Sequence, residues 1–480
     1  MEVGISFDCR RFTLELAEID TPLRQAIAMQ VDRWNPQLRR WLDEASRASG
    51  FDVVGIAEVR APHDPAAAQD AGRFEVWIGA GRAGDMDYLK RRDQSGMLLR
   101  GNLRVAIPWA RSAIVCAMSY NFAAPFIRSE DQLTLLPRAA APLSIHPAPP
   151  GSGWIARYAW TGSTLNDEST IIPTDYHDEL LARLRAIESA LLVRAACTTR
   201  CCVDTGPFVE RALAAQAGIG WIGKNTCLIH QQLGSWLLLA VLVTSLPVEQ
   251  EREGVDETHS ASTPVIPLLP HSPNLSTKRY KEFPFGIKTT LQAPDRCGTC
   301  TRCIDACPTG ALLGSKSPDA PRQMDASRCI AYLTIEKKGA IDPSLRAPMG
   351  RHVFGCDICQ DVCPWNRKPS SITPGAPSIA PGAPSIQRSL RNGWESMQPR
   401  PNLINPPLDW LSAMDSRQFK LLFKGSPLQR TDRKRLLRNV AIAMGNSGEA
   451  RFLPQLDAWA AGDDPVLADA AEWARARLLA

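Results

Sequence analysis

The stretch that decides the fold is CGTCTRCIDACPTGAL at residues 297–312, where four cysteines have the spacing C-x2-C-x2-C-x3-C and a proline follows the last. A second stretch, GCDICQDVCPWN at residues 355–366, repeats the ending C-x2-C-x3-C-P. In such runs three neighbouring thiolates hold one iron–sulfur cluster, and the fourth cysteine is carried to the adjacent cluster. The two stretches therefore predict a ferredoxin-like domain with two [4Fe-4S] clusters.

The spacing divides the cysteines of this region into two interlocking ligand sets. The first cluster is predicted to be held by Cys297, Cys300, Cys303 and Cys363. The second is predicted to be held by Cys307, Cys329, Cys356 and Cys359. A pair of zinc sites is the alternative, since C-x2-C pairs also suit zinc. Zinc does not explain the third close cysteine or the two Cys-Pro endings, so we favour two cubane clusters.

Length, charge and cysteine usage limit the class of protein. The 480 residues suffice for two or three domains, and 44% hydrophobic with 22% charged residues is ordinary for a soluble chain. No apolar run is long enough to span a bilayer, and residues 1–20 contain acidic side chains where a signal peptide is apolar. We expect a cytoplasmic protein without a membrane partner, and a net charge of +5 leaves other partners open.

Outside the cysteine-rich region, the patterning predicts an α/β domain. Residues 36–59 combine an amphipathic helical pattern, a glycine stop and an apolar strand pattern. Strand patterns also occur at 112–122 and 236–246, and the second is apolar on both faces, as in a sheet covered by helices. A helix is predicted over residues 175–192. These elements together indicate a covered sheet.

Composition marks the boundaries between the predicted domains. Two stretches rich in Pro, Ser and Ala, at about 128–172 and 248–292, are predicted surface insertions. The C-terminal residues hold two helical patterns, the second like one unit of a helical repeat. The predicted organisation is an N-terminal extension (1–35), an α/β domain (36–292), a ferredoxin-like domain (293–370), a Pro-rich linker (371–400) and a helical domain (401–480).

The six remaining cysteines are predicted to be structural. They are irregularly spaced or isolated, and free cysteine is commonly buried as a small hydrophobe. They are Cys9, Cys116, Cys197, Cys201, Cys202 and Cys227.

Several motifs together resemble the epoxyqueuosine reductase family. They are RYAW and DYHDELLARL within 157–184, VDTGPFVERALAAQAGIGWIGKNTCLI at 203–229, RCIAYLTIEKKGAI at 328–341, and the two cysteine stretches. The resemblance implies a cobalamin-binding α/β domain similar to the catalytic core of reductive dehalogenases, a two-cluster ferredoxin domain and C-terminal helical repeats of the HEAT type. Cobalamin is implied by the resemblance alone, because composition and spacing do not indicate a corrin.

The resemblance implies an oxidoreductase that reduces epoxyqueuosine to queuosine in the anticodon loop of tRNA, the last step of queuosine biosynthesis. The reaction would use cob(I)alamin and electrons that two clusters receive from a low-potential donor, and we expect a monomer. Two alternatives stay open. A corrinoid reductive dehalogenase would typically carry a twin-arginine export signal, and a ferredoxin-type electron carrier would need no corrin.

Asp204, in the VDTG motif, matches the proposed proton donor of the family. Without the resemblance, an Asp before Thr-Gly is more often a turn residue whose carboxylate caps local backbone N–H groups. As an acid near neutral pH, the Asp204 carboxyl should be partly desolvated, which would raise its pKa.

The resemblance also assigns residues to a cobalamin site. Lys224 and Asn225 match a loop over the corrin, where neighbouring glycines would permit close backbone approach, and an exposed solvated lysine is the alternative. Asp175 begins a predicted helix, so N-capping is its other role. The predicted set is Arg100, Ala156, Arg157, Asp175, Asp204, Lys224, Asn225, Leu228 and Ala331.

A basic segment at residues 429–440 is the predicted tRNA contact. Its positive charges fall within about two helical turns, which suits phosphate binding. The alternative is a solvated helix face with the apolar residues Leu436, Leu437 and Val440 turned inward. The predicted tRNA-binding residues are Arg430, Arg433, Lys434, Arg435 and Arg438.

Overall fold

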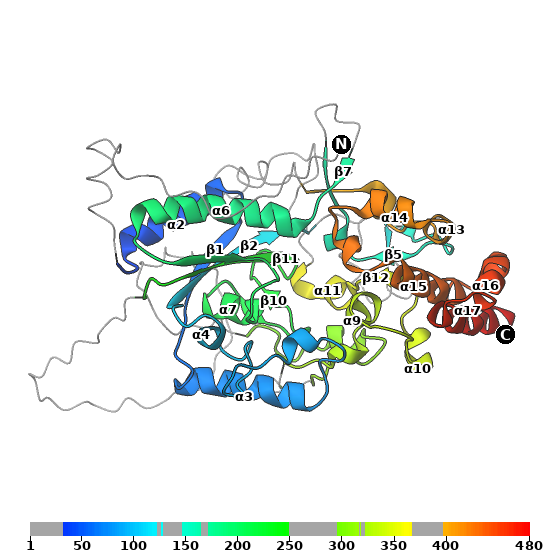
Figure 1. Ribbon diagram of the computed structural model, residues 1–480, viewed down its shortest axis with the longest axis horizontal. Helices are drawn as coiled ribbons and strands as arrows, with labels where there is room; N and C mark the ends of the chain where they lie inside the picture. The colour runs from blue at the N-terminus through cyan, green and yellow to red at the C-terminus, as the bar shows by residue number, and fades with distance from the viewer. Residues whose placement is uncertain are drawn as a thin grey trace, which may run out of the picture.

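A computed structural model of the chain describes residues 32–121, 146–164, 171–248, 295–315, 322–366 and 397–480, with short pieces at 126–127 and 317. The predicted N-terminal extension, most of both insertions and most of the Pro-rich linker lie outside the described residues. Along the long axis of Figure 1, the cysteine-rich segment lies between a helix-covered sheet and the C-terminal helices.

The α/β domain is built on a four-stranded sheet with the order β1-β2-β11-β8. Its strands are β1 (Val53–Glu58), β2 (Ser112–Ser119), β11 (Leu237–Thr244) and β8 (Thr199–Cys202), and all neighbouring pairs are antiparallel. All eight residues of β2 are buried, which accounts for the apolar pattern at 112–122. An antiparallel sheet often has one solvent-exposed face, but neither face of this central strand is exposed.

Helices cover both faces of this sheet (Figure 1). On one face, α2 (Pro36–Ala48) and α6 (Tyr176–Arg194) share a core with Ile114 and Leu242. On the other, α4 (Leu103–Ala106) and α7 (Glu210–Gln216) share a core with Val115 and Val241. Successive strand residues point to opposite faces, so these neighbouring side chains serve different layers. α3 (Pro65–Gly79) reaches the cysteine-rich segment, where Trp77 Nε1 donates to Met324 O at 2.7 Å.

The predicted insertion at 128–172 is too long, because residues 154–162 belong to the core. β5 (Trp154–Ile155) is buried and pairs in parallel with β12 (His352–Phe354). β6 (Thr161–Thr164) pairs with β7 (Ile171–Pro173) and with β13 (Gln398–Pro399). The Pro- and Ala-rich composition ends before these strands, and the buried Trp154 marks the return to the core. A further two-residue pair joins β3 (Phe126–Ile127) and β4 (His146–Pro147).

The cysteine-rich segment consists of short helices joined by turns. They are α8 (Arg302–Asp305), α9 (Ile330–Ile335), α10 (Pro343–Arg346) and α11 (Ile358–Asp361). Opposite them lies a hairpin of β9 (Trp221–Ile222) and β10 (Leu228–Ile229), and Trp221 contacts Trp365 edge-on at 4.9 Å. The sheet domain and the cysteine-rich segment are therefore packed together.

The C-terminal helices close the other side of the cysteine-rich segment. They are α13 (Leu408–Ser412), α14 (Ser416–Phe423), α15 (Arg433–Gly445), α16 (Leu453–Ala460) and α17 (Pro465–Leu479). Asn439 on α15 donates to Thr334 O at 2.8 Å and to Val353 O at 3.0 Å. These bonds hold the long segment between Cys329 and Cys356, which a compact two-cluster ferredoxin would not contain. The predicted HEAT-type repeat stays a prediction.

One hydrophobic core runs through the three predicted domains. Its buried members include Leu42 on α2, Val353 on β12 and Val440 on α15. The domain boundaries stay predictions, but the described parts of these domains fold against one another. Among the described residues, no helix is both long and apolar enough to cross a membrane.

Candidate active site and cluster-binding segment

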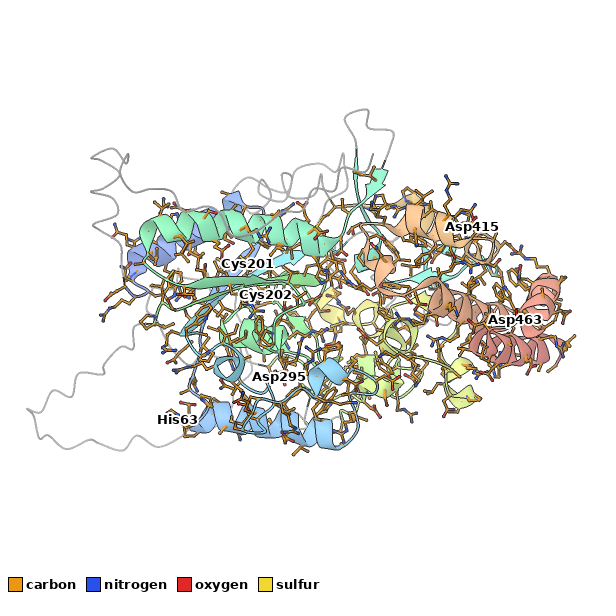
Figure 2. The ribbon with its side chains drawn as sticks, viewed as in Figure 1. His63, Cys201, Cys202, Asp295, Asp415 and Asp463 are labelled. Atoms are coloured by element: carbon orange, nitrogen blue, oxygen red, sulfur yellow. The ribbon has the colours of Figure 1, made fainter. Side chains whose placement is uncertain are left out.

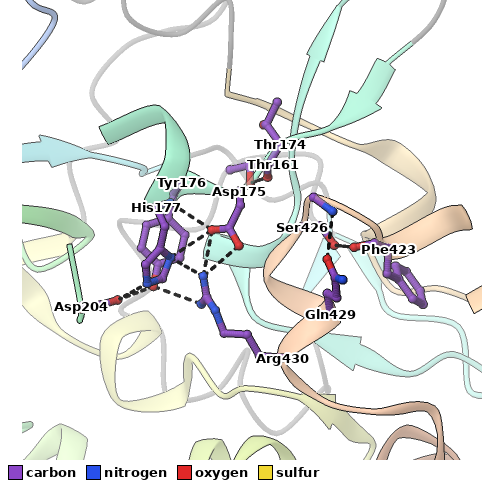
Figure 3. A network of polar contacts seen from close by, with 11 residues as sticks. Thr161, Thr174, Asp175, Tyr176, His177, Asp204, Phe423, Ser426, Gln429 and Arg430 are labelled. Carbon is purple, nitrogen blue, oxygen red and sulfur yellow. Dashed lines mark hydrogen bonds and ion pairs between the residues drawn. The ribbon is translucent and has the colours of Figure 1, made fainter. Parts of the chain in front are cut away.

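A polar network surrounds Asp204 (Figure 3), and we call Asp175, Tyr176, His177, Asp204 and Arg430 the Asp204 corner. Asp204 lies in the turn between β8 and α7 with φ of 53°, a left-handed conformation that Asp tolerates better than most residues. The Tyr176 hydroxyl donates to Asp204 Oδ2, and His177 Nε2 lies 3.7 Å from the same oxygen. The Asp204 side chain is 52% exposed, so the carboxylate is open to a substrate and the expected desolvation is not found.

Asp175 and Arg430 complete the Asp204 corner. Asp175 caps α6 by accepting from His177 N at 3.0 Å, which confirms its capping role. Arg430 Nη2 donates to both Asp175 oxygens, at 2.8 and 3.0 Å, and Nη1 donates to the Tyr176 hydroxyl at 3.3 Å. Although burial disfavours the Asp175 charge, hydrogen bonds from His177 and the positive charge of Arg430 lower the pKa of this carboxyl. The C-terminal region therefore contributes a side chain to the corner.

A second carboxyl group, that of Glu210 in the first turn of α7, faces Asp204. Burial raises the pKa of Glu210 to about 9, and the adjacent Asp204 carboxylate adds to the shift. Glu210 also accepts a hydrogen bond from the Asp204 backbone N–H. Its Oε1 is buried and has no hydrogen-bond partner among the described residues. Glu210 was not predicted as a site residue, although it lies in the VDTGPFVER motif with Asp204.

Arg100, predicted to be near cobalamin, lies close to this carboxyl pair. Its Nη1 donates to Phe208 O at 3.1 Å, and its guanidinium lies 5.2 Å from the centre of the Tyr88 ring. Burial lowers the pKa of Arg100, and the nearby charges of Glu210 and Asp204 act in the opposite direction. The Arg100 guanidinium therefore lies near the carboxyl groups of both Asp204 and Glu210.

The predicted cluster ligands gather in two groups. In the first, burial and the nearby thiols of Cys297 and Cys300 raise the pKa of Cys303 to about 12, and Cys363 packs with Cys297. In the second, burial raises the pKa of Cys329, with the nearby Cys307 thiol adding to the shift, and Cys359 lies near Cys356 and Cys329. Cys363 and Cys307 thus lie with the opposite stretch, as the C-x2-C-x2-C-x3-C-P spacing describes. The assignment of each cysteine to a cluster stays a prediction.

A zinc site and a cubane cluster differ in how closely their thiolates approach one another. Among the residues that the structure describes, no three His, Cys, Asp or Glu side chains lie close enough to hold a single metal ion. Four thiolates on one zinc ion lie about 3.8 Å apart, because each binds the same ion at about 2.3 Å. In a cubane each thiolate binds a different iron, so the sulfurs stand farther apart.

Lys224 and Asn225, predicted to lie over a corrin, sit in the turn between β9 and β10. Lys224 is 2% exposed and its Nζ donates to Gly298 O at 2.7 Å, so the exposed-lysine alternative is wrong. Asn225 Oδ1 accepts from Cys227 N at 3.1 Å, whereas its buried Nδ2 has no partner among the described residues. The rim of a corrin carries amide groups that accept hydrogen bonds, so an unsatisfied buried amide donor fits a bound corrin.

Packing within the protein requires glycine at two positions of this hairpin. A Cβ at Gly220 would lie 2.2 Å from Ile229 O. A Cβ at Gly223 would lie 2.4 Å from Ile229 Cδ1. Glycine at these positions therefore lets β9 and β10 come together.

The other predicted cobalamin residues lie along the cysteine-rich segment or in the core. The Arg157 backbone N–H donates to Asp357 Oδ2 at 2.8 Å, and Arg157 Nη2 lies 3.0 Å from Asp361 Oδ1. The backbone N–H of Ala331 donates to the Cys329 sulfur. Ala156 and Leu228 are buried. The predicted set therefore divides between the Asp204 corner, the β9–β10 turn and the cysteine-rich segment.

Aromatic contacts connect the Asp204 corner to the second cysteine stretch. The Tyr176 and Tyr158 rings meet edge-on at 5.8 Å. Tyr158 lies 6.0 Å from Phe354, which ends β12 two residues before Cys356. The proposed proton donor is thus linked by packed rings to a predicted cluster ligand.

The prediction that Arg438 binds tRNA is wrong. Its side chain is 1% exposed, and its guanidinium donates to Leu333 O at 2.7 Å, Gly339 O at 2.6 Å and Lys337 O at 2.9 Å. Leu436, Leu437 and Val440 are also buried, so the inward-facing alternative describes most of α15.

The guanidinium groups of Arg433 and Arg435 also donate hydrogen bonds within the protein. Arg433 donates to Met414 O and Arg435 donates to Ile335 O, both at 2.6 Å. Lys434, in contrast, is 82% exposed and lies 3.4 Å from Asp464. Of the predicted tRNA-binding residues, Lys434 therefore offers the most exposed charge.

The remaining cysteines do not form another ligand set. Cys201 and Cys202 lie on β8 (Figure 2), and burial raises the pKa of Cys116 on β2 to about 12. Cys227, which is isolated in the sequence, lies beside the thiol of Cys359. Cys9 lies outside the described residues.

Comparison with known proteins identifies the family. Residues 296–366 match the family model of a 4Fe-4S double cluster binding domain, and residues 100–205 match the model of epoxyqueuosine reductase QueG. The epoxyqueuosine reductase of Xanthomonas campestris pv. campestris is 30% identical over 438 residues, which are 90% of this chain and 94% of that relative. The chain belongs to the epoxyqueuosine reductase family. Its cofactors are accordingly two [4Fe-4S] clusters and cobalamin.

Solved structures of epoxyqueuosine reductases have the same fold. One was determined with a tRNA-Tyr epoxyqueuosine-modified tRNA stem loop, and another, from Bacillus subtilis, has an aspartate-bearing catalytic loop swung out of the active site. Each has a TM-score of 0.62 and 25% sequence identity, over 92% of this chain and 90% of the other. The predicted combination of an α/β domain with a two-cluster domain is thereby confirmed.

Proposed function

We propose that this member of the epoxyqueuosine reductase family reduces the epoxide of epoxyqueuosine in a tRNA anticodon loop, with Asp204 protonating the epoxide oxygen. The position of Asp204 carries the proposal. Its carboxylate is half exposed, on a turn with positive φ, and is contacted by Tyr176 and His177. Backbone strain of this kind is most often found where a side chain has to be presented to a substrate.

The residues of the Asp204 corner have separate roles in this proposal. Tyr176 and His177 fix the direction of the Asp204 carboxyl, since both contact Oδ2. Arg430 holds Asp175 and Tyr176 and so positions the start of α6. Protonation of the departing oxygen by a positioned acid typically contributes a factor of about 10²–10⁴ to the rate.

The cofactors would be held by the side chains assigned above. The two cysteine groups would hold the clusters, and Arg100, Lys224 and Asn225 would donate to cobalamin, with Asn225 Nδ2 gaining its missing partner. When bound, cobalamin supplies a strongly reducing, nucleophilic cobalt to the reaction. Lys224 also contacts Gly298, between Cys297 and Cys300, and thus joins the two cofactor regions.

A tRNA substrate would contact the C-terminal side of the molecule. Modified bases are read in single-stranded loops, where they can turn outward into a site. Lys434 is exposed on α15, the helix that follows the segment carrying Arg430 of the corner. We propose that α15, α16 and α17 form the HEAT-type repeat and offer phosphate contacts, and that the protein acts as a monomer in the cytoplasm with a low-potential electron donor.

The Asp204→Asn variant tests the role of Asp204. Its shape and contacts are nearly kept, so the spectra of reconstituted clusters and cobalamin should match those of the wild type. Single-turnover formation of queuosine, measured by mass spectrometry of nucleosides, should fall at least about 100-fold. Asp70→Asn on the exposed face of α3 is the matched control. Wild-type turnover in Asp204→Asn would remove Asp204 from the proton-donor role.

A further inference from the structure

The proposed reaction needs more protons than Asp204 can deliver alone. Both C–O bonds of the epoxide break, a C=C bond forms between the two ring carbons, and the oxygen leaves as water. The balance therefore requires two electrons, which the clusters pass on from the low-potential donor, and two protons. Asp204 carries a single carboxyl proton, so it has to be reloaded within each turnover or a second acid has to act.

The Glu210 carboxyl is placed to reload Asp204. It faces the Asp204 side chain from the first turn of α7 and accepts from the Asp204 backbone N–H. Its Oε1 is buried without a hydrogen-bond partner among the described residues. A buried carboxylate oxygen without a donor is costly, whereas a protonated carboxyl group lowers that cost and can donate to the neighbouring carboxylate.

The surrounding charges fit an acid that is protonated at rest and ionises transiently. Asp204 disfavours a second negative charge, and burial has the same effect, so the pKa of Glu210 is raised to about 9. On the β8 side lies the Cys202 thiol, whose pKa is raised by burial. The Arg100 guanidinium is the nearby cation, and it would stabilise the Glu210 carboxylate once the proton has left.

We propose that Glu210 passes a proton to Asp204 within each turnover and so supplies the second proton of the epoxide reduction. This inference rests on the proposed function. When the substrate covers the pair, Asp204 takes a proton from solvent and gives it to the epoxide oxygen. The O–H bond of Glu210 then breaks as an O–H bond forms on Asp204. Half-exposed Asp204 then returns solvent protons to Glu210 between turnovers. Glu210 acts through Asp204 and does not touch the substrate.

The alternative is a structural role, in which Glu210 only holds the Asp204 turn through the backbone N–H. Glu210→Gln separates the two roles, because glutamine keeps the shape and the acceptor but cannot deliver a proton. Glu44→Gln is the matched control, since Glu44 lies exposed on α2, on the opposite face of the sheet. Iron content and circular dichroism verify that each variant is folded and loaded.

The test is the single-turnover rate of queuosine formation from epoxyqueuosine-containing tRNA between about pH 6 and about pH 10. The wild type and Glu44→Gln should keep their rate until the pH approaches the Glu210 pKa of about 9. Glu210→Gln should be about 10- to 100-fold slower at neutral pH. Its rate should fall with rising pH from neutral onward and increase with added imidazole buffer, because its second proton comes from solution.

Either of two results would overturn the proton-supplying role. One is a Glu210→Gln variant with the wild-type rate, and the other is a slower variant with the wild-type pH profile and no buffer dependence. Should Glu210→Gln fail to fold, Glu210→Asp serves instead. The pH at which its single-turnover rate falls on the alkaline side should differ from that of the wild type. An unchanged alkaline fall would count against the proposal. A wild-type protein that forms no queuosine would refute the proposed function itself, which is a distinct outcome.

Discussion

The cysteine-rich segment and the Asp204 corner are built in opposite ways. Seven of the eight predicted ligands come from two short stretches, 297–307 and 356–363, whose spacing is itself the binding pattern. The corner instead joins the start of α6, the turn after β8 and Arg430, which is 255 residues from Asp175 in the chain. The first is a local property of the chain, whereas the second exists only after the whole molecule has folded.

This difference determines how each region responds to change. Loss of a thiolate should remove a cluster and leave the corner in place, since the corner makes no use of the cysteines. Loss of a long-range contact should disturb the corner and leave the clusters in place. α15 is the exception, because it holds the segment between Cys329 and Cys356 and directly follows the segment that carries Arg430.

The largest effect is expected from Cys356→Ala. A [4Fe-4S] cluster without one of its four thiolates is usually lost, so iron should fall from about eight to about four per chain. Queuosine formation should stop, because electrons no longer pass through both clusters. Cys202→Ala, in the sheet, is the control and should keep all of its iron. Full iron content in Cys356→Ala would refute the assigned ligand set.

Arg438→Ala should have the next largest effect, and on stability. The substitution leaves three carbonyl groups, those of Leu333, Lys337 and Gly339, without their buried donor. The free energy of unfolding should fall by about 3 kcal/mol, measured by anaerobic urea denaturation of reconstituted protein. A decrease in the free energy of unfolding below about 0.5 kcal/mol would mean that the Arg438 contacts of α15 do not stabilise the cysteine-rich segment.

Arg430→Ala should act on the corner alone. Removal of the charge-assisted bonds to Asp175 leaves the start of α6 less well held, so single-turnover formation of queuosine should fall about 10-fold. Iron content should stay at the wild-type value. Lys420→Ala, exposed on α14, is the control. An unchanged rate in Arg430→Ala would show that the corner is positioned without this long-range contact.

The smallest effect is expected from Lys434→Ala. Its exposed ammonium group can neutralise one phosphate, so tRNA binding should weaken a few-fold and the slope of log affinity against log salt should decrease by about one. Folding stability should change by less than about 0.5 kcal/mol. A salt slope equal to that of the wild type would exclude Lys434 from the tRNA interface.

The parts of this molecule that were predictable from the sequence depend on short-range patterns. The cysteine spacing indicates two clusters, and the apolar runs at 112–122 and 236–246 are the two central strands. Asp175 was predicted as a helix cap because capping involves only neighbouring residues. Asp204 was identified by resemblance, since its local sequence alone favours a turn residue.

The errors have a shared physical cause. Arg438 was predicted at a tRNA interface because charge usually marks a surface, but here three backbone carbonyls compensate for its burial. The contact of Arg430 with Asp175 was not predicted, because nothing in residues 429–440 reveals that partner. Glu210 was missed because its burial depends on how α7 packs on the sheet. Residues that are distant in the sequence and come into contact only in the folded protein show no characteristic spacing along the chain.

The most direct test of the account is the fate of the modified nucleoside. Epoxyqueuosine-containing tRNA would be incubated anaerobically with reconstituted protein and a strong reductant, with and without cobalamin, and its nucleosides measured by mass spectrometry. The account predicts conversion to queuosine only when cobalamin is present. No conversion by protein whose iron content and EPR spectra confirm both clusters would contradict it.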